Sequence, residues 1–431
     1  MRAILWLVGL FALASAGAWM LVSNDGLVSI FLAPYRIDLS LNLAVLVLLG
    51  LVLGLLLVQR ALVALLSLPR QARRWRLLQR ERAAHAALFE AMADFQAGRF
   101  VRARKAAQQA LEREASLQDD DHPLPHAPSL RALAHLLSAE AAHALQDPAL
   151  RESHWQQALG AAAQASGHVQ ASLTEGLHLR QARWQLDQRD ASASLAVLAQ
   201  LAPAVLRRTA TMRLQLKAAQ LAGQTGQALE TAQLLAKHRA FSPMAAQSLL
   251  RRLALQWLQA QRDPGALTSA WSRLPEALRH SPEVATAAVQ RLLALDGDRA
   301  QARQWLLPVW EAALSSGQRS DWLALVLALR ATLRGDDPAS ADTRAWLARI
   351  ETAQQRQPGE PLLQFLAGMA CHQQQLWGKA QHQMQQALKG ALPVALQRQA
   401  WQVLAELAEQ RQDSAAALHA WRQAAQLELN T

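Results

Sequence analysis

The chain has 431 residues, a formal net charge of +11 and a single cysteine, which excludes an intramolecular disulfide and a cysteine-based metal cluster. Residues 1–82 hold nine Lys/Arg and three Asp/Glu, which leaves 35 basic and 30 acidic residues for the rest. This concentration beside apolar segments favours contact with anionic lipid over nucleic acid. The abundance of alanine, leucine, glutamine and arginine favours helix, and no sheet is expected.

The first apolar segment, Ala3–Val22, follows Arg2 and is long enough to span a bilayer. A cleaved signal peptide is the alternative, because Arg2, the short apolar stretch and Ala14-Ser15-Ala16 resemble its three regions. The apolar run continues through Trp19–Val22, beyond the supposed cleavage point. We therefore interpret it as the first helix of a transmembrane hairpin.

The connection Ser23–Asp38 holds the turn residues Asn24-Asp25-Gly26 and Pro34, with one basic residue against two acids. The alternation around Val28 and Ile30 would allow a short β-hairpin, although a loop is the simpler interpretation. We expect this connection to lie outside the cytoplasm.

The second apolar segment, Leu39–Val58, has 20 residues without charge, and its polar side chains are Ser40 and Asn42. As a helix it is about 30 Å long, the thickness of a bilayer's hydrocarbon core. Beyond it, one acid, Glu81, accompanies seven arginines: Arg60, Arg70, Arg73, Arg74, Arg76, Arg80 and Arg82. The positive-inside rule places this end in the cytoplasm.

The N-terminal part therefore divides into a transmembrane hairpin with a short periplasmic loop, residues 1–68, and a basic juxtamembrane segment, residues 69–82. In this segment we expect six arginines to contact anionic lipid at the membrane surface: Arg70, Arg73, Arg74, Arg76, Arg80 and Arg82. Everything that follows is expected to be cytoplasmic.

Residues 83–431 are predicted to form a tetratricopeptide-like α-solenoid, which makes the whole chain all-α. Short turns recur, each followed five positions later by a small residue: Gly98 with Ala103, Gln188 with Ala193, Gly223 with Ala228, Gly297 with Ala302, Gln375 with Ala380, and Gln412 with Ala417. Weaker copies are Gln146-Asp147 and Gln261-Arg262. From residue 188 the spacings are 35 to 38, with one gap of 78 that would hold two units.

Small residues are expected where the two helices of a unit cross, because they allow close approach. Ala91 with Ala103 and Ala110 is one predicted crossing, and Ala405 with Ala417 and Ala424 is another. Such helix pairs stack into a superhelix with a concave face that suits protein partners.

One stretch, Asp119–Pro128, interrupts the repeats with three prolines, which indicates an inserted loop, and helix is expected to resume with Ser129 as its N-cap. His122 and His126 stand in this loop with three aspartates, a set that could collect a metal ion. A proline-rich loop does not preorganise such a site, so a solvated loop is the simpler interpretation.

No motif for a nucleophile elbow, a phosphate loop or a zinc peptidase occurs, so an enzyme is not expected. Cys371-His372 could offer an axial ligand to haem. The position falls inside the first helix of a repeat, however, where a cysteine more simply packs as a small hydrophobe. The candidate haem ligands are thus Cys371, His372, His122 and His126.

Several motifs resemble the HemY family of bacterial inner-membrane proteins. They are Asn24-Asp25-Gly26 and Arg36-Ile37-Asp38-Leu39-Ser40-Leu41, then Leu68-Pro69-Arg70, Ala270-Trp271-Ser272-Arg273-Leu274-Pro275, Arg279-His280-Ser281-Pro282-Glu283, and Gln374-Gln375-Leu376-Trp377-Gly378-Lys379-Ala380. The resemblance covers nearly the whole chain except the histidine-containing loop. The chain bears no resemblance to the protoporphyrinogen oxidase that shares the family's name, because it lacks a dinucleotide-binding glycine motif.

The resemblance implies a multi-pass inner-membrane protein that supports a late step of protohaem synthesis. Its partners would be pathway enzymes, and haem is a possible cofactor. A tetrapyrrole carrier and a repeat scaffold for another envelope process remain alternatives. The residues by themselves support a membrane-tethered scaffold.

Overall fold

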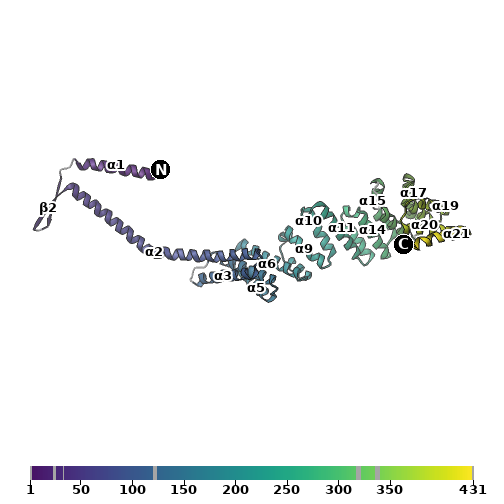
Figure 1. Cartoon of the computed structure of the whole chain (residues 1–431), viewed down its shortest axis with the longest axis horizontal. Helices are drawn as coiled ribbons and strands as arrows, with labels where there is room; N and C mark the ends of the chain where they lie inside the picture. Colours follow the sequence, from purple (N-terminus) through teal and green to yellow (C-terminus); the bar gives the residue numbers. More distant parts are fainter. Residues whose placement is uncertain are drawn as a thin grey trace. The chain divides into compact units, whose positions relative to one another are not determined.

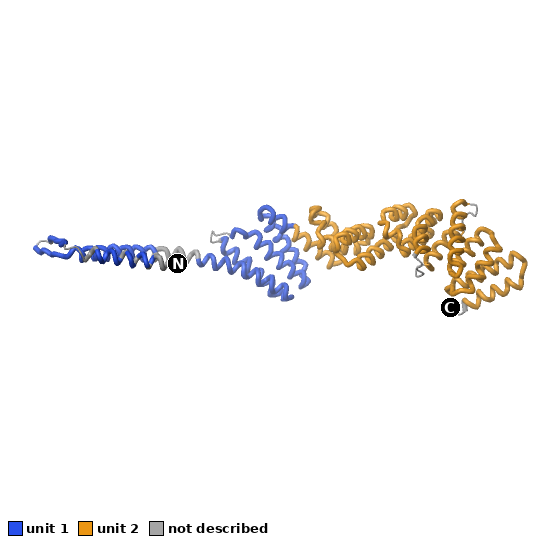
Figure 2. Tube along the Cα trace, turned by 90° about the horizontal axis from the view of Figure 1, so that it is seen from above, with its two compact units in different colours: residues 1–174 blue, residues 175–431 orange. Residues whose placement is uncertain are grey.

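The computed structural model describes residues 2–22, 26–32, 34–119, 124–316, 322–334 and 340–429. In these ranges the chain forms helices and one two-stranded sheet (Figure 1). It divides into two compact units, residues 1–174 and 175–431, with the division inside helix α6 (Figure 2). Each unit is described separately.

Unit 1 begins with helix α1, Arg2–Val22, and an antiparallel hairpin of β1, Leu27–Leu32, and β2, Tyr35–Ser40. The expectations of a loop here and of no sheet were therefore wrong. The register pairs Ser29 with Asp38, and the Ser29 hydroxyl donates to the Asp38 carboxylate at 2.5 Å. Alternating apolar residues and this cross-strand hydrogen bond stabilise strands over an irregular loop.

Helix α2, Leu41–Gln96, begins two residues later than the apolar run, because Leu39 and Ser40 belong to β2. The Ser40 hydroxyl caps the helix by accepting from the Leu43 N–H at 3.3 Å. Within the described residues, the helical segment with the length and composition of a membrane span is Leu41–Val63, whose mean hydropathy is 2.9. Helix α1, the first helix of the expected hairpin, is not among the candidate spans found in the described residues.

The remaining helices of unit 1 are α3, Phe100–Asp119, α4, Ala127–Ala144, α5, Pro148–Ala163, and the first part of α6, Gly167–Asp187. Helix α2 packs on α3, α3 on α4, and α4 on α5. Small residues line the crossing of α2 and α3, where Ala91, Ala103 and Ala110 are fully buried. The Arg113 guanidinium donates to the Ala83 carbonyl across the same crossing at 2.7 Å. The predicted close approach of these helices is confirmed.

The beginning of α4 differs from the expectation. The helix starts at Ala127 after N-cap His126, and Pro128 lies in its first turn, so Ser129 is not the N-cap. Proline is tolerated in a first helical turn, where its missing N–H would have had no partner in the helix. Helix α4 therefore includes the last two residues of the stretch that was predicted to be a loop.

Unit 2 continues the repeats, each of which consists of a first helix, a turn and a second helix. After α6 its elements are α7, Ala191–Ala199, α8, Pro203–Leu206, α9, Thr209–Leu221, α10, Thr225–Lys237, α11, Pro243–Gln259, α12, Pro264–Arg273, α13, Glu276–Arg279, α14, Pro282–Ala294, α15, Arg299–Ser316, α16, Trp322–Leu333, α17, Ala341–Arg356, α18, Pro361–Gln373, α19, Trp377–Lys389, α20, Val394–Gln410, and α21, Ser414–Leu429. The gap of 78 residues contains the additional pair α16 and α17, as expected for two units.

The repeat turns occur between helices as predicted. Their backbones enter the left-handed region at Gly98, Gln146, Arg189, Gly223, Gln375 and Gln412, with φ between 58° and 74°. The small residues Ala103, Ala228, Ala302 and Ala380 that follow are fully buried, and Ala417 is nearly so. A residue in this region ends one helix so that the next can return antiparallel to it.

In the repeat turn predicted at Gln188, both the turn residue and the small residue lie one position later than predicted. Helix α7 starts at Ala191, so the buried small residue is Ser194 and not the half-buried Ala193. The Ser194 hydroxyl donates to the Ala182 carbonyl of α6 at 2.8 Å, which satisfies a polar group inside the crossing.

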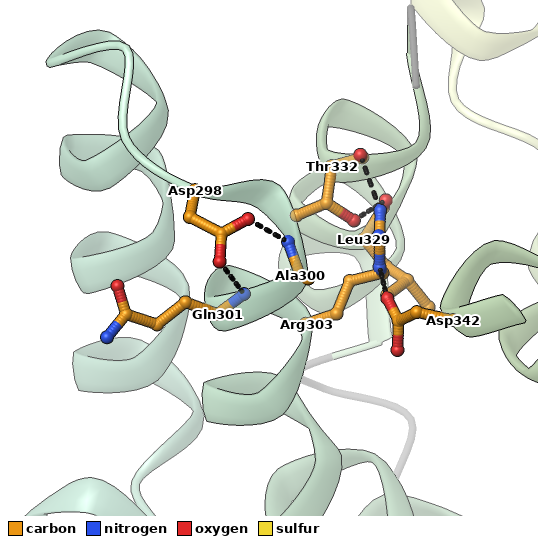
Figure 3. Close-up of polar contacts among 7 residues, drawn as sticks. All are labelled: Asp298, Ala300, Gln301, Arg303, Leu329, Thr332 and Asp342. Carbon is orange, nitrogen blue, oxygen red and sulfur yellow. Dashed lines mark hydrogen bonds and ion pairs between the residues drawn. The ribbon is translucent and has the colours of Figure 1, made fainter. Parts of the chain in front are cut away.

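A buried ion pair connects three helices of unit 2 (Figure 3). Arg303 of α15 is 1% exposed, and its Nε donates to the Asp342 carboxylate of α17 at 2.5 Å. Its Nη1 donates to the Thr332 carbonyl of α16 at 2.9 Å. A buried guanidinium requires such partners, so Arg303 fixes these helix ends against each other.

Candidate functional site

The candidate site is the face that the first helices of unit 2 present together. Consecutive first helices α11, α14, α16, α18 and α20 contact one another in succession. Two cavities lie on first helices: the basic cavity, lined by α6 and α9, and the C-terminal cavity, lined by α16, α18 and α20 together with Arg334 at the end of α16. No second helix contributes to either lining.

The basic cavity has a volume of about 410 Å³. Its lining combines two half-buried leucines with four exposed cationic side chains, Arg180, Arg183, Arg213 and Lys217, and contains no acidic residue. The other lining residues are Leu179, Ala210, Thr211 and Leu214. Exposed cations above apolar surface can bind a ligand that carries both carboxylates and apolar groups.

The helical spacing explains why these cations meet. Arg180 and Arg183 are three residues apart on α6, and Arg213 and Lys217 are four apart on α9, so each pair shares one side of its helix. Arg213 is held in place because its Nη2 donates to the Ala240 carbonyl at 2.8 Å. Arg183 and Lys217 have no ion pair or hydrogen bond within the described ranges.

A buried hydroxyl also lies at the basic cavity. Thr211 is 1% exposed, and its Oγ1 has no hydrogen-bond partner among the residues that the structure describes. A buried hydroxyl without a partner carries a free-energy penalty.

The C-terminal cavity has a volume of about 340 Å³ and a mostly polar lining: Arg330, Leu333, Arg334, Met369, His372, Gln373, Gln399, Gln402, Val403 and Glu406. The His372 Nε2 lies 3.5 Å from the Glu406 carboxylate. Burial and the neighbouring Arg334 lower the pKa of Arg330. The charges are of both signs, unlike those of the basic cavity.

Of the two predicted haem ligands in unit 2, one lines a cavity and the other does not. His372 lines the C-terminal cavity, whereas the adjacent Cys371 is 1% exposed and packs in the hydrophobic core. Burial raises the pKa of the Cys371 thiol to about 11, which opposes the thiolate that binds iron. The polar lining around His372 also does not supply the apolar walls of a haem slot.

The histidine loop lies only partly within the described residues. His126 is exposed at the beginning of α4, and His122 lies outside the described residues. Within the described ranges no group of three or more His, Cys, Asp or Glu side chains could hold a metal ion.

The predicted membrane-surface arginines all lie on α2. Arg76, Arg80 and Arg82 are exposed, whereas the side chains of Arg70, Arg73 and Arg74 are outside the description. The four cations of the basic cavity were not predicted to form a site, because basic residues spread over 38 positions of the sequence resemble ordinary surface charges. Their pairing on two successive first helices was the available signal.

These observations define a tetratricopeptide-like helical repeat protein with a candidate membrane anchor. A family model described as the HemY protein N-terminus matches residues 26–146. The resemblance to the HemY family is thereby confirmed. A comparison with curated protein sequences gives no match.

Similar solved structures include Naa15/Naa10 bound to HypK-THB, the APC/C hetero-tetramer Cut9-Hcn1 and the TPR domain of P58(IPK). Their sequence identities are 12%, 11% and 12%, and their TM-scores are 0.21, 0.26 and 0.21. The matches cover 78%, 79% and 80% of this chain, and 58%, 65% and 98% of those chains. The fold assignment rests on the helix pairs and turns of this chain and not on these likenesses.

Proposed function

We propose that this protein is a membrane-anchored repeat scaffold of the bacterial inner membrane that binds other proteins on the first-helix face of unit 2. The observation that carries this proposal is that first helices alone line both cavities. Successive first helices in a repeat stack form a continuous surface for a peptide or helix of a partner. The pathway that it serves would be a late step of protohaem synthesis, as the HemY resemblance implies.

The anchor would be a two-helix hairpin made of α1 and the first part of α2. Both termini would then be cytoplasmic, with Ser23–Asp38 in the periplasm and the arginines after residue 69 against anionic lipid. The exposed positions of Arg76, Arg80 and Arg82 support that contact. Confinement to the membrane would raise the effective concentration of the scaffold near membrane-bound enzymes, so that weak binding suffices.

Reporter fusions test the proposed topology. A reporter active only in the periplasm is expected to work when fused at Pro34 and to fail at Leu88 and Ala416. Activity at Leu88 and Ala416 would reverse the orientation.

Photo-crosslinking in membranes tests the proposed binding face. A crosslinking residue placed at Gln402, on the first helix α20, is expected to capture specific proteins, and one at Lys237, on the second helix α10, is not. Late haem-pathway enzymes among the captured proteins, together with porphyrin accumulation in a deletion strain, would support the haem assignment. Capture of proteins from another envelope process, with unchanged porphyrin levels, would leave the scaffold and remove the haem assignment.

The alternative of a haem or porphyrin carrier has weaker support, because Cys371 is in the core and the lining around His372 is mostly polar. A titration of the full chain with haem checks it. Stoichiometric binding that His372→Ala abolishes, without captured partners, would replace the scaffold proposal by the carrier.

A further inference from the structure

The basic cavity restricts the chemistry of the ligand that can dock there. Its four cations come from two helices, and no acid lies in the lining, so the cavity favours an anionic ligand. Between them, Leu179 and Leu214 contribute apolar surface. The complementary ligand therefore combines several negative charges with at least one apolar group.

We propose that the basic cavity docks an acidic segment of a partner protein, with its carboxylates on the four cations and its apolar side chains on the two leucines. This inference rests on the proposed function and names the partner's chemistry. Cations distributed over two helices match carboxylates distributed along a peptide, whereas a small anion would occupy one or two of them. An exposed arginine, Arg252, follows on the next first helix, α11.

A porphyrin also carries carboxylates on an apolar body, but the lining favours a peptide. It contains no His, Cys, Met or Tyr that could bind the iron of haem. Its four cations are exposed, so the carboxylates of an extended segment can reach them from solvent.

The test uses the full chain in detergent and a fluorescein-labelled peptide that alternates glutamate with leucine. The site variant is Arg183→Glu with Lys217→Glu, since neither side chain has a partner to lose in the described ranges. The matched control is Lys237→Glu with Arg262→Glu, two exposed cations of unit 2 outside both cavity linings. Circular dichroism of both variants verifies that they fold.

We expect the unmodified chain to bind the peptide and to bind its glutamine counterpart far more weakly. The site variant should weaken binding about tenfold or more, because each reversal removes an attraction and adds a repulsion, and the control should change it little. Added salt should weaken the binding of the unmodified chain. Equal binding by the site variant and the unmodified chain would overturn the proposal.

Two further measurements separate the competing outcomes. Protoporphyrin that binds more tightly than the peptide, and loses that affinity in the site variant, would assign the cavity to a porphyrin and overturn the acidic-segment proposal. Crosslinking from Gln402 in membranes, repeated with the site variant, addresses the partner itself. Unchanged capture there would overturn the acidic-segment proposal and leave the proposed scaffold function standing, whereas reduced capture would support both.

Discussion

The two units achieve helix packing with different side chains. In unit 2 a single hydrophobic cluster extends from Met212 to Ala420 and includes large buried rings such as Trp310 and Trp346. In unit 1 the clusters are smaller, and the crossing of α2 with α3 and α4 depends mainly on alanines. Apolar area removed from water sets much of the stabilisation, so unit 1 is expected to open at a lower free energy than unit 2.

The difference shows two solutions to stacking helices. Alanine crossings bring backbones close and leave little side chain to bury, whereas tryptophan crossings fill a wider gap with contact area. In unit 2 the rings of Trp271 and Trp305 stack at 4.8 Å, and Trp310 meets Trp322 and Trp346 edge-to-face. The following predictions refer to the full chain in detergent, with hydrogen exchange read separately in each unit.

The largest effect is expected from Trp310→Ala. Trp310 is 1% exposed and contacts two other tryptophans, so its removal leaves a cavity that unit 2 cannot fill by relaxation. We expect a loss of about 3–5 kcal/mol in the opening free energy of unit 2. Exchange in unit 1 should not change, and a change there would show that the two units open together.

Arg303→Met should destabilise unit 2 by about 2–3 kcal/mol, which is below the usual range for a broken buried ion pair. The reason is that the Asp342 side chain is 34% exposed and can be hydrated after its partner is lost. Asp342→Asn serves as the control, because it keeps a hydrogen-bond acceptor for Arg303. If Arg303→Met is as stable as the unmodified chain, the network of Figure 3 contributes no net stability.

Ala103→Trp and Ala417→Trp compare matched crossings in the two units. Both alanines lie at the small position of a repeat, and each substitution should destabilise its own unit by about 1–3 kcal/mol through overpacking. The loss of stability should be larger for Ala103→Trp than for Ala417→Trp, because Ala103 is fully buried in the alanine crossing and Ala417 is 5% exposed. The reverse order would contradict the assignment of close approach to unit 1.

The smallest effect concerns pH and unit 1. Burial, followed by His154 and Arg131, lowers the pKa of His135 to about 4 from its ordinary value near 6.5. Between these pH values His135 is protonated in the unfolded chain and neutral in the folded chain. Protonation therefore favours the unfolded state, and unit 1 should lose stability as the pH falls from 6.5 towards 4. His135→Asn should reduce this loss, and His238→Asn, an exposed control in unit 2, should not.

Much of the repeat architecture could be predicted, because a left-handed turn residue and a buried small residue five positions later are local signals. The turns at Gly98, Gln375 and Gln412 were placed correctly for this reason. At Arg189 the same signal was read one residue early, since Ala193 and Ser194 are both small and only the helix start distinguishes them. A hairpin at Leu27–Leu32 and Tyr35–Ser40 was considered, but a loop was preferred, because six-residue strands between apolar helices give a weak pattern.

The sites were harder to predict than the fold. Arg303 occupies a position where a charged residue usually faces water, and its partner Asp342 is 39 residues away. The cations of the basic cavity are brought together by the contact between repeats, and no local pattern reports that contact. His372 was selected from the sequence for its chemistry, and the structure places it in a cavity without the other candidate ligands.

The length of helix α2 between the candidate span and the first repeat sets the greatest distance between the two. From Val63, where the candidate span ends, to Ala84, the first buried alanine of the repeat, the helix rises at most about 32 Å at 1.5 Å per residue. A folded domain of 100 residues has a radius of gyration of about 13 Å, and a sphere with that radius of gyration is about 34 Å across. In the proposed anchored topology, this part of α2 would leave room for a domain of about this size or smaller between the lipid surface and the first repeat, and a larger partner would have to approach from the side.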